Sequence, residues 1–394
     1  MPPNLKELEK ALINNWWLYP GFDLELVATG LDLPVNIAFV PSPPDKPKSQ
    51  SPFFYITELY GQVKVVTHDG KVHTYAENLL NYKPTHEIPG HGESGLTGIC
   101  VDPPTGDLFL SMLYKDKNEI KGKVVRTSSK NGLKMDSLKI VIDNIPSTTR
   151  AHQIQAVTIG FDNKLYVNVA DGGEWKKAQD DNDLRGKVLR MEKDGSIPWD
   201  NPNPDSYIYA KGFRNPFGAA WRKSDQCLYI AGNGPDVDDR IAKVKPFENY
   251  GWPGTMRKNS IFWWHYTQAP TALDFMQRGQ FPPQFNDHLF VALFGEAFAE
   301  GLGVKGKKIV KLQLNEDSTA VKSYDDFIIY RGENAASPCG LAFGPDALYF
   351  TDLHGDKVKG KKTGGNVYKI KPNKEVLAEM KGHTDKYGEI WSKP

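Results

Sequence analysis

Four polar residues stand just before alternating apolar runs. His152 begins "HQIQAVTIG", Glu93 begins "ESGLTG", and Arg214 and Asn215 are neighbours in "GFRNPFG". A histidine and a carboxylate at one place can move protons, and an arginine beside an asparagine can hold an anion. None of these stretches is specific alone. The chemistry therefore depends on whether the fold brings the four residues together.

The elements that must position these residues recur six times along the chain. In each copy a small or apolar residue begins a short strand, a turn with Asp, Gly, Pro or Asn follows, and a second strand reads Leu-aromatic-apolar. A period of about 60 residues with four-strand content predicts an all-β fold, a six-bladed β-propeller of four-stranded blades, rather than an open sandwich array. The second strands begin near Phe53, Asp107, Lys164, Cys227, His288 and Ala347.

The two ends of this repeat array predict how the ring closes. The segments "GFDLELVATGL" and "GGNVYKIKP" both alternate apolar and polar residues. We expect the N-terminal strand Asp23–Gly30 to pair with Val367–Ile370 in the last blade, which also removes exposed sheet edges. The predicted parts of the chain are an N-terminal helical extension (1–20), the propeller (21–372) and a C-terminal tail (373–394).

A propeller fold would bring these four residues together. The innermost strand of each blade lines the central channel, so the residues just before these strands meet at one mouth of it. We therefore expect Glu93, His152, Arg214 and Asn215 to face one another there. This set could perform acid–base chemistry or clamp an anion.

Composition narrows the class of protein. The 394 residues are 39% hydrophobic with 36 glycines and 28 prolines, which suits many short strands joined by turns. The net charge of +1 and the absence of an arginine-rich module give no sign of a nucleic-acid partner. No run is apolar enough for a transmembrane segment, and the first residues do not read as a signal peptide. The three cysteines show neither a disulfide framework nor zinc-ligand spacing.

Several longer motifs resemble a known family. "GESGLTGICVDP", "GKVLRMEKDGSIPWDNP", "GFRNPFGAAW", "NGPDVDDRI" and "NYGWP" occur in this order. They are similar to the successive motifs of the soluble quinoprotein sugar dehydrogenases, the glucose/sorbosone and aldose dehydrogenase family. The resemblance extends from about Asp23 to Lys371. It implies a six-bladed propeller that uses pyrroloquinoline quinone (PQQ) and calcium to oxidise an aldose sugar or a related aldehyde or alcohol.

The resemblance also implies roles and surroundings. His152 matches the general base, and an imidazole suits this role because its ordinary pKa is about 6.5. Asp171 matches the carboxylate that orients this histidine. The family further implies a small-molecule sugar substrate, an external electron acceptor and an extracytoplasmic or secreted location. Arg214 matches a catalytic residue beside the quinone's reactive carbonyls. The remaining matches are to the cofactor-binding residues Glu93, Arg214 and Asn215 and to the calcium-binding carbonyls of Gly234 and Pro235.

Two departures concern the PQQ carboxylates. The family places a Lys or Arg at the end of a strand in the fifth repeat, where this chain has Phe294 in "FVALFGEAF". In the sixth repeat the family has arginines before the inner strand, where this chain has Ala336–Pro338. PQQ carries three carboxylates, and burying them without paired cations is costly. We therefore expect an altered carboxylate site and weakened PQQ binding, unless Arg331 or Lys305 reaches in.

A third departure is structural. Family members often hold a second calcium with a Glu ten residues before the Tyr of "NYGWP", and this chain has Arg240 ten residues before Tyr250. An arginine cannot ligate calcium, but its charge can replace the ion among the same oxygens. We expect no second calcium beside Tyr250.

The sequence is also compatible with two other functions. One is a cofactor-free, lactonase-like propeller hydrolase that uses a channel metal with His152. The other is a non-catalytic propeller that binds a carbohydrate or a partner, for which the aromatics of "NSIFWWHYTQ" (259–268) could stack on sugar rings. The same segment could instead be a packed insertion between blades.

Overall fold

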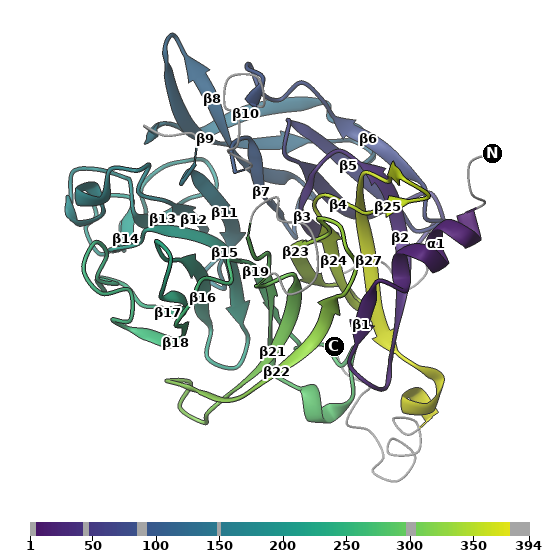
Figure 1. Ribbon diagram of the computed structural model, residues 1–394. Helices are drawn as coiled ribbons and strands as arrows, with labels where there is room; N and C mark the ends of the chain where they lie inside the picture. The colour runs from purple at the N-terminus through teal and green to yellow at the C-terminus, as the bar shows by residue number, and fades with distance from the viewer. Residues whose placement is uncertain (1–4, 42–46, 85–92, 148–150, 297–304, 379–394) are drawn as a thin grey trace.

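Six antiparallel sheets stand around a common centre in chain order (Figure 1). The structure is a computed structural model, and it describes residues 5–41, 47–84, 93–147, 151–296 and 305–378. The innermost strand of each sheet contacts the innermost strand of the next, and the contact between the last and the first closes the ring. The predicted six-bladed β-propeller is confirmed.

Each blade is a meander of four strands, counted from the channel outward, and the blades are numbered 1 to 6 in the order in which their innermost strands follow along the chain. The innermost strands are β3 (Pro34–Phe39), β7 (Leu96–Val101), β11 (Ile154–Ile159), β15 (Asn215–Arg222), β19 (Pro270–Phe275) and β23 (Pro338–Phe343). The second strands are β4 (Pro52–Glu58), β8 (Leu108–Asp116), β12 (Leu165–Val169), β16 (Cys227–Asn233), β20 (Leu289–Leu293) and β24 (Leu348–Asp352). The third strands are β5 (Gln62–Thr67), β9 (Glu119–Ser128), β13 (Lys187–Met191), β17 (Asp239–Val244), β21 (Lys308–Leu314) and β27 (Gly365–Pro372). The outer strands are β6 (Val72–Ala76), β10 (Ser137–Ser147), β14 (Ile208–Lys211), β18 (Ser260–Trp264), β22 (Val321–Tyr330) and β2 (Phe22–Leu31).

The last blade takes its outer strand from the start of the chain. Strand β2 pairs antiparallel with β27, with Leu24 opposite Ile370 and Leu26 opposite Tyr368. The predicted pairing of the two ends is therefore confirmed. Joining the first and last parts of the propeller in one sheet closes the ring through backbone hydrogen bonds.

Short elements decorate the ring. Helix α1 (Leu5–Ile13) leads into β1 (Trp16–Leu18), which pairs with β22 and gives blade 5 a fifth strand. The lysine-rich loop after β24 forms the two-stranded hairpin of β25 (Lys357–Val358) and β26 (Lys361–Lys362). Two 3₁₀ turns, Trp175–Gln179 and Pro283–Phe285, lie in connections.

Three glycines on alternate inner strands let neighbouring blades touch at the backbone. Gly98 in blade 2, Gly218 in blade 4 and Gly340 in blade 6 each face the inner strand of the next blade. A Cβ at Gly98 would overlap the backbone of Gln155, and one at Gly340 would overlap that of Val35. Only a residue without a side chain permits this close approach.

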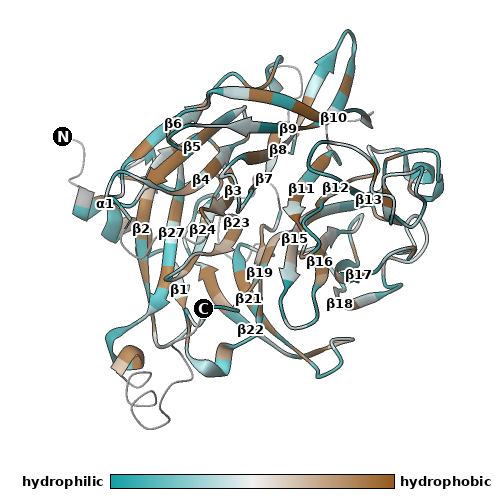
Figure 2. Ribbon diagram, turned by 180° about the vertical axis from the view of Figure 1, so that it is seen from behind, coloured by the Kyte–Doolittle hydropathy of each residue, from teal (hydrophilic) through white to brown (hydrophobic). Residues whose placement is uncertain are grey.

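The blades are held together by apolar side chains packed between adjacent sheets. Val63 and Val65 of blade 1, for example, pack in one buried cluster with Leu108 and Leu110 of blade 2. Figure 2 shows the hydrophobic residues gathered in the strands, whereas the connecting loops are largely hydrophilic. None of the described helices is long and apolar enough to cross a membrane.

Candidate functional site

His152 lies in the loop just before β11, at one mouth of the channel, and is held from three sides. Its backbone N–H donates to Glu93 Oε2 at 2.9 Å, and its carbonyl accepts from Gly172 N at 3.1 Å. Its ring Nδ1 lies 2.8 Å from Asp171 Oδ1. The residue has a left-handed backbone with φ of 56°, a conformation that non-glycine residues adopt at a cost of about 1–3 kcal/mol and that clusters at functional sites.

Asp171 fixes the tautomer of His152. Besides the imidazole, Asp171 accepts from Gly173 N at 2.9 Å and, through Oδ2, from Trp252 Nε1 at 2.8 Å. Burial acts to raise the pKa of Asp171, but these donors and the His152 ring outweigh it and leave the pKa below its ordinary value. An ionised carboxylate only accepts, so His152 Nδ1 carries the hydrogen and Nε2 keeps a free lone pair.

Glu93 joins the loops of three blades. Its Oε2 accepts from His152 N and, at 3.1 Å, from Asn215 Nδ2. Glu93 precedes β7, and Asn215 is the first residue of β15, so the contact ties blades 2, 3 and 4 together at the mouth. The structure thus brings these three predicted site residues together.

Arg214 completes the group but turns toward the carbonyls of the next turn. Its Nη1 donates to Gly234 O at 2.7 Å and to Asn233 O at 3.3 Å. Its guanidinium lies 5.7 Å from the centre of the Trp252 ring, a cation–π distance. Burial lowers the pKa of Arg214, although Asp171 and other nearby carboxylates oppose this. Arg214 is therefore hydrogen-bonded to the carbonyl of Gly234, which the sequence predicts to be a calcium ligand.

The Gly234 turn is shaped by its own sequence. A Cβ on Gly234 would overlap Val237 O, so only glycine fits. Asp239 Oδ1 accepts a hydrogen bond from Gly234 N at 2.8 Å, and this bond holds the turn in place. Gly234 is buried and Pro235 is exposed.

Two buried amide oxygens beside this turn have no partner. Asn215 and Asn233 lie directly opposite each other in the β15–β16 ladder. The Oδ1 atoms of both are buried without a hydrogen-bond partner among the described residues. Unsatisfied buried oxygens are rare and often mark an ion or water that belongs there. With the carbonyl of Gly234 they form an all-oxygen donor set, the kind that calcium prefers. No cluster of three or more His, Cys, Asp or Glu suited to a metal exists in the part of the chain that is described.

On the other side of the mouth an apolar cluster lies beside His354, whose ring is 5.7 Å from that of Phe294. Near the ends of the second strands, blade 3 has Asp171 and blade 4 has Asn233, both polar. At the corresponding place in blade 5, just after β20, the residue is Phe294. Phe294 is 9% exposed and belongs to a compact cluster from blades 1, 5 and 6. The members of this cluster are Phe294, Cys339, Leu353, Leu33, Val35 and Ala269.

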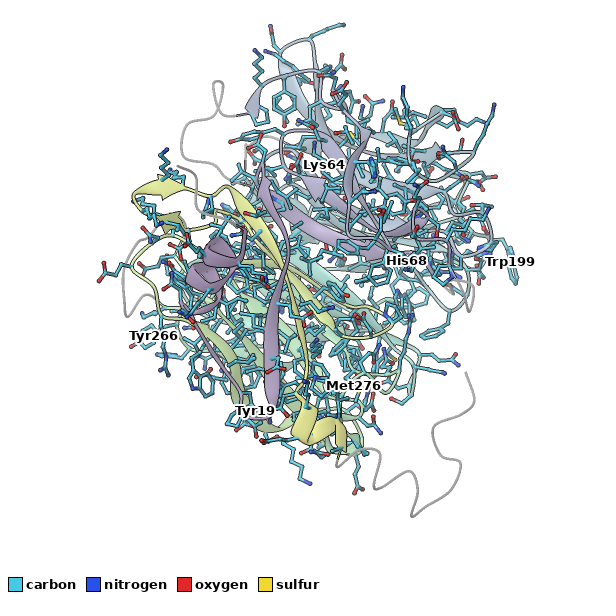
Figure 3. All side chains as sticks on the ribbon, turned by 90° about the vertical axis from the view of Figure 1, so that its right-hand side faces the viewer. Tyr19, Lys64, His68, Trp199, Tyr266 and Met276 are labelled. Atoms are coloured by element: carbon cyan, nitrogen blue, oxygen red, sulfur yellow. The ribbon has the colours of Figure 1, made fainter. Side chains whose placement is uncertain are left out.

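The two cations suggested as substitutes lie elsewhere. The guanidinium of Arg331 lies 5.5 Å from the Trp17 ring, beside the extra strand of blade 5. The ammonium of Lys305 lies 4.5 Å from the Tyr266 ring. Figure 3 shows Tyr266 at the edge of the molecule, where it is 57% exposed.

Most of the aromatic segment 259–268 forms the outer strand of a blade. Residues Ser260–Trp264 form β18, the outer strand of blade 4, and Trp264 is buried in the cluster between blades 4 and 5. Trp263 is 44% exposed and pairs with the guanidinium of Arg257 at 5.6 Å. The tryptophans therefore lie in the outer strand of blade 4, whereas Thr267 and Gln268 at the end of the segment bond Asp239, which also holds the Gly234 turn.

Arg240 is a deeply buried cation between the third strand of blade 4 and the loop after it. It is 1% exposed, and its guanidinium donates to four backbone carbonyls. These are Tyr250 O at 2.6 Å, Met256 O at 2.7 Å, Lys258 O at 3.3 Å and Gly212 O at 3.3 Å. Burial lowers the pKa of Arg240 to about 10.

Two important residues were not identified from the sequence. Trp252 contacts both Asp171 and Arg214, but it is 81 residues from Asp171, and nothing in the motif "NYGWP" points to these two partners. Asp239 supports the Gly234 turn, and its Oδ2 also accepts from Gln268 N at 2.6 Å and Ala269 N at 2.8 Å. The sequence signal that could have identified Asp239 is its position in "NGPDVDDRI", five residues after Gly234.

Known proteins match most of this chain. The sequence profile described as "Glucose / Sorbosone dehydrogenase" matches residues 32–333. Quinoprotein glucose dehydrogenase B of Acinetobacter calcoaceticus is 31% identical over 195 residues, which is 41% of this chain and 40% of that protein. Aldose sugar dehydrogenase YliI of Escherichia coli (strain K12) is 24% identical over 259 residues, 57% of this chain and 69% of that protein.

Solved structures share the fold. A protein described as an oxidoreductase (glucose dehydrogenase) from Thermus thermophilus superposes with a TM-score of 0.71 at 24% identity, covering 89% of this chain and 100% of that one. The PQQ-bound aldose sugar dehydrogenase from Streptomyces coelicolor superposes with a TM-score of 0.65 at 21% identity, covering 90% and 100%.

Proposed function

The chain belongs to the glucose/sorbosone dehydrogenase family, and from this premise we propose that it is a PQQ- and calcium-dependent dehydrogenase that oxidises an aldose sugar or a related aldehyde or alcohol and passes the electrons to an external acceptor. The observation that carries the proposal is the oriented His152–Asp171 pair beside Glu93, Arg214 and Asn215. A base with a fixed free lone pair at a channel mouth is what abstraction of a hydroxyl proton requires.

The donor set beside β15 and β16 supports the calcium part of the proposal. The unpartnered oxygens of Asn215 and Asn233 and the carbonyl of Gly234 would hold the ion. Pro235, as the next residue in the turn, would add its carbonyl. Glu93, Arg214 and Asn215 would lie against the quinone.

The residues of the chain perform the proton chemistry. When bound, PQQ supplies an ortho-quinone that takes up a hydride, that is, two electrons with one proton, from the sugar carbon. His152 Nε2 takes the proton of the sugar hydroxyl. Asp171 stabilises the positive charge that this transfer places on the imidazole. Arg214 and the second amide hydrogen of Asn215 supply donors at the same mouth.

The apolar cluster around Phe294 supports an altered carboxylate site. Phe294 and Cys339 occupy the side where the family resemblance expects cations. Lys362 lines a small cavity on that side together with Leu353 and His354. Burial, together with the charges of Lys362 and Lys307, lowers the pKa of His354 to about 4.

We expect PQQ to bind in the micromolar range when calcium is present. Two missing charge-assisted hydrogen bonds, each worth about 1.5–3 kcal/mol, weaken binding about a hundredfold or more. Calorimetric titration of the protein with PQQ measures this. Phe294→Lys should tighten binding about tenfold, whereas Phe161→Lys, at the other end of the channel, should not.

Either extreme of affinity would contradict this expectation. Nanomolar binding would mean that another cation serves the carboxylates, and Lys362→Gln would then weaken it. Absence of binding at high micromolar PQQ would overturn the dehydrogenase proposal in favour of a hydrolase or a binding protein. The visible spectrum after addition of PQQ, calcium and then a panel of aldoses reports both cofactor loading and reduction.

Calcium must compete with Arg214 for the carbonyl of Gly234. We therefore expect Arg214→Gln to bind calcium at least about tenfold more tightly than the wild type in the absence of PQQ, because no charged hydrogen bond has to be broken. Calorimetry with calcium chloride measures the change. Arg331→Gln is the matched control, since this arginine lies beside Trp17. Unchanged or weaker calcium binding in Arg214→Gln would place the ion elsewhere.

A further inference from the structure

The channel holds a cavity at the end away from His152. Its volume is about 550 Å³, and residues from the innermost strands of all six blades line it. None of the His152-site residues is among them. Thr158 lines the cavity six residues beyond His152, which along a strand is about 20 Å. The two ends of the channel are therefore separate places.

Small side chains leave this end of the channel open. Ala156, Ala219 and Ala342 line its wall from three different blades. Larger residues at these positions would fill the space, as they do in a packed barrel interior. The opening is therefore a property of the sequence of the inner strands.

One carboxylate lies in this wall. Asp274 accepts from Phe275 N through Oδ1 and from Phe343 N through Oδ2, both at 2.8 Å. Each carboxylate oxygen can accept two hydrogen bonds, so each keeps one acceptor site. Burial raises the pKa of Asp274 to about 6. The remaining acceptor sites suit hydroxyl donors.

Two cations line the same cavity. Lys223 follows β15 and Arg278 follows β19, and neither forms an ion pair with any carboxylate of the described residues. Other acids nearby are already paired, since Asp287 bonds Arg222 and Asp225 lies 2.8 Å from Lys243. The charge of Arg278 acts on Asp274 of the same wall without forming an ion pair with it, so two cations face one carboxylate and leave positive charge available to an anion.

Aromatic surface completes the cavity. The Phe161 ring is 51% exposed and stands edge-on to Trp221 at 5.9 Å. Trp221 is fixed by its Nε1 donation to Thr158 Oγ1 at 3.2 Å. Rigid aromatic rings pack well against the C–H faces of sugars.

From these features we propose that this end of the channel is a second ligand site, for a small polyhydroxylated anion such as a sugar acid or a sugar phosphate. The anionic group lies between Lys223 and Arg278. The hydroxyls donate to Asp274, and the carbon skeleton packs on Phe161 and Trp221.

Calorimetric titration with gluconate, glucose 6-phosphate and glucose tests the site. The protein is used without PQQ and calcium, so the outcome does not depend on the dehydrogenase activity. At least one of the two anions should bind, and glucose should bind at least tenfold more weakly than that anion. Binding of gluconate alone identifies a sugar-acid site, and binding of glucose 6-phosphate alone a sugar-phosphate site. Absence of both, or equal binding of glucose, overturns the proposal.

Variants locate the binding. Lys223→Gln and Arg278→Gln should each weaken the anion about tenfold or more, because each removes a charged hydrogen bond. Asp274→Asn should weaken it less, since an amide oxygen still accepts. Lys322→Gln, an exposed lysine outside the cavity, and Arg214→Gln, at the other mouth, should leave binding unchanged. Loss of binding in Arg214→Gln alone would place the anion in the His152 mouth and overturn the proposal.

Discussion

Replacing His152 by alanine is expected to lower sugar-dependent dye reduction by the PQQ-loaded protein at least about 100-fold, while the PQQ dissociation constant changes little. The reason is geometric. The Nε2 atom has no hydrogen-bond partner among the described residues, and the bond from Nδ1 to Asp171 at 2.8 Å fixes Nε2 as the proton acceptor. The loss should appear in kcat, because the base acts on the substrate proton in the reaction step.

Two companion variants separate catalysis from folding. Asp171→Asn should lower kcat at least about tenfold with KM nearly unchanged, because an amide can pair with either tautomer of the ring. His265→Ala is the matched control, since His265 is exposed beside Tyr266 at the edge of blade 4 and should keep full activity. If His152→Ala retained wild-type kcat on every sugar that the enzyme oxidises, another group would be the base.

The fold could be predicted from the sequence because one strand pattern repeats along the chain. Six copies of one strand pair, with a period of about 60 residues, determine both the number of blades and the strand that leads each of them. The alternation in the two terminal segments predicted that β2 joins β27, and Leu24 does lie opposite Ile370. The strand β1 was not predicted, because three apolar residues carry no usable periodicity.

The site was predicted only in part, for a physical reason. Glu93, His152, Arg214 and Asn215 hold equivalent places in successive repeats, so the ring itself implies that they meet. Contacts made by long side chains across blades follow no such rule. The donation from Arg214 to Gly234 O depends on the rotamer of one flexible side chain, and no spacing in the sequence encodes it.

Arg240→Met is expected to lower the free energy of unfolding by about 3–5 kcal/mol. The guanidinium donates to four carbonyls, three of them in buried hydrogen bonds, and lies 5.5 Å from the Phe213 ring and 5.7 Å from the Tyr250 ring. Methionine keeps much of the volume but leaves carbonyls without donors, at about 1–3 kcal/mol for each that water cannot reach. Urea denaturation followed by circular dichroism measures the loss. Arg257→Met, which removes a half-exposed arginine from the same blade, should change stability by less than about 1 kcal/mol.

The charge reversal Arg240→Glu tests why a cation is needed there. Four carbonyl oxygens that converge on one guanidinium form a negative cage, and a carboxylate placed in it would be repelled unless a metal ion joined it. We expect Arg240→Glu to be destabilised at least as much as Arg240→Met in the presence of a chelator. Millimolar calcium should restore more than about 1 kcal/mol to Arg240→Glu, and it should restore nothing to Arg240→Met. If calcium stabilised both variants equally, the gain would come from the Gly234 turn. If it stabilised neither, the carbonyls around Arg240 would be a site for a guanidinium alone, and the arginine could not be regarded as the replacement of an ion.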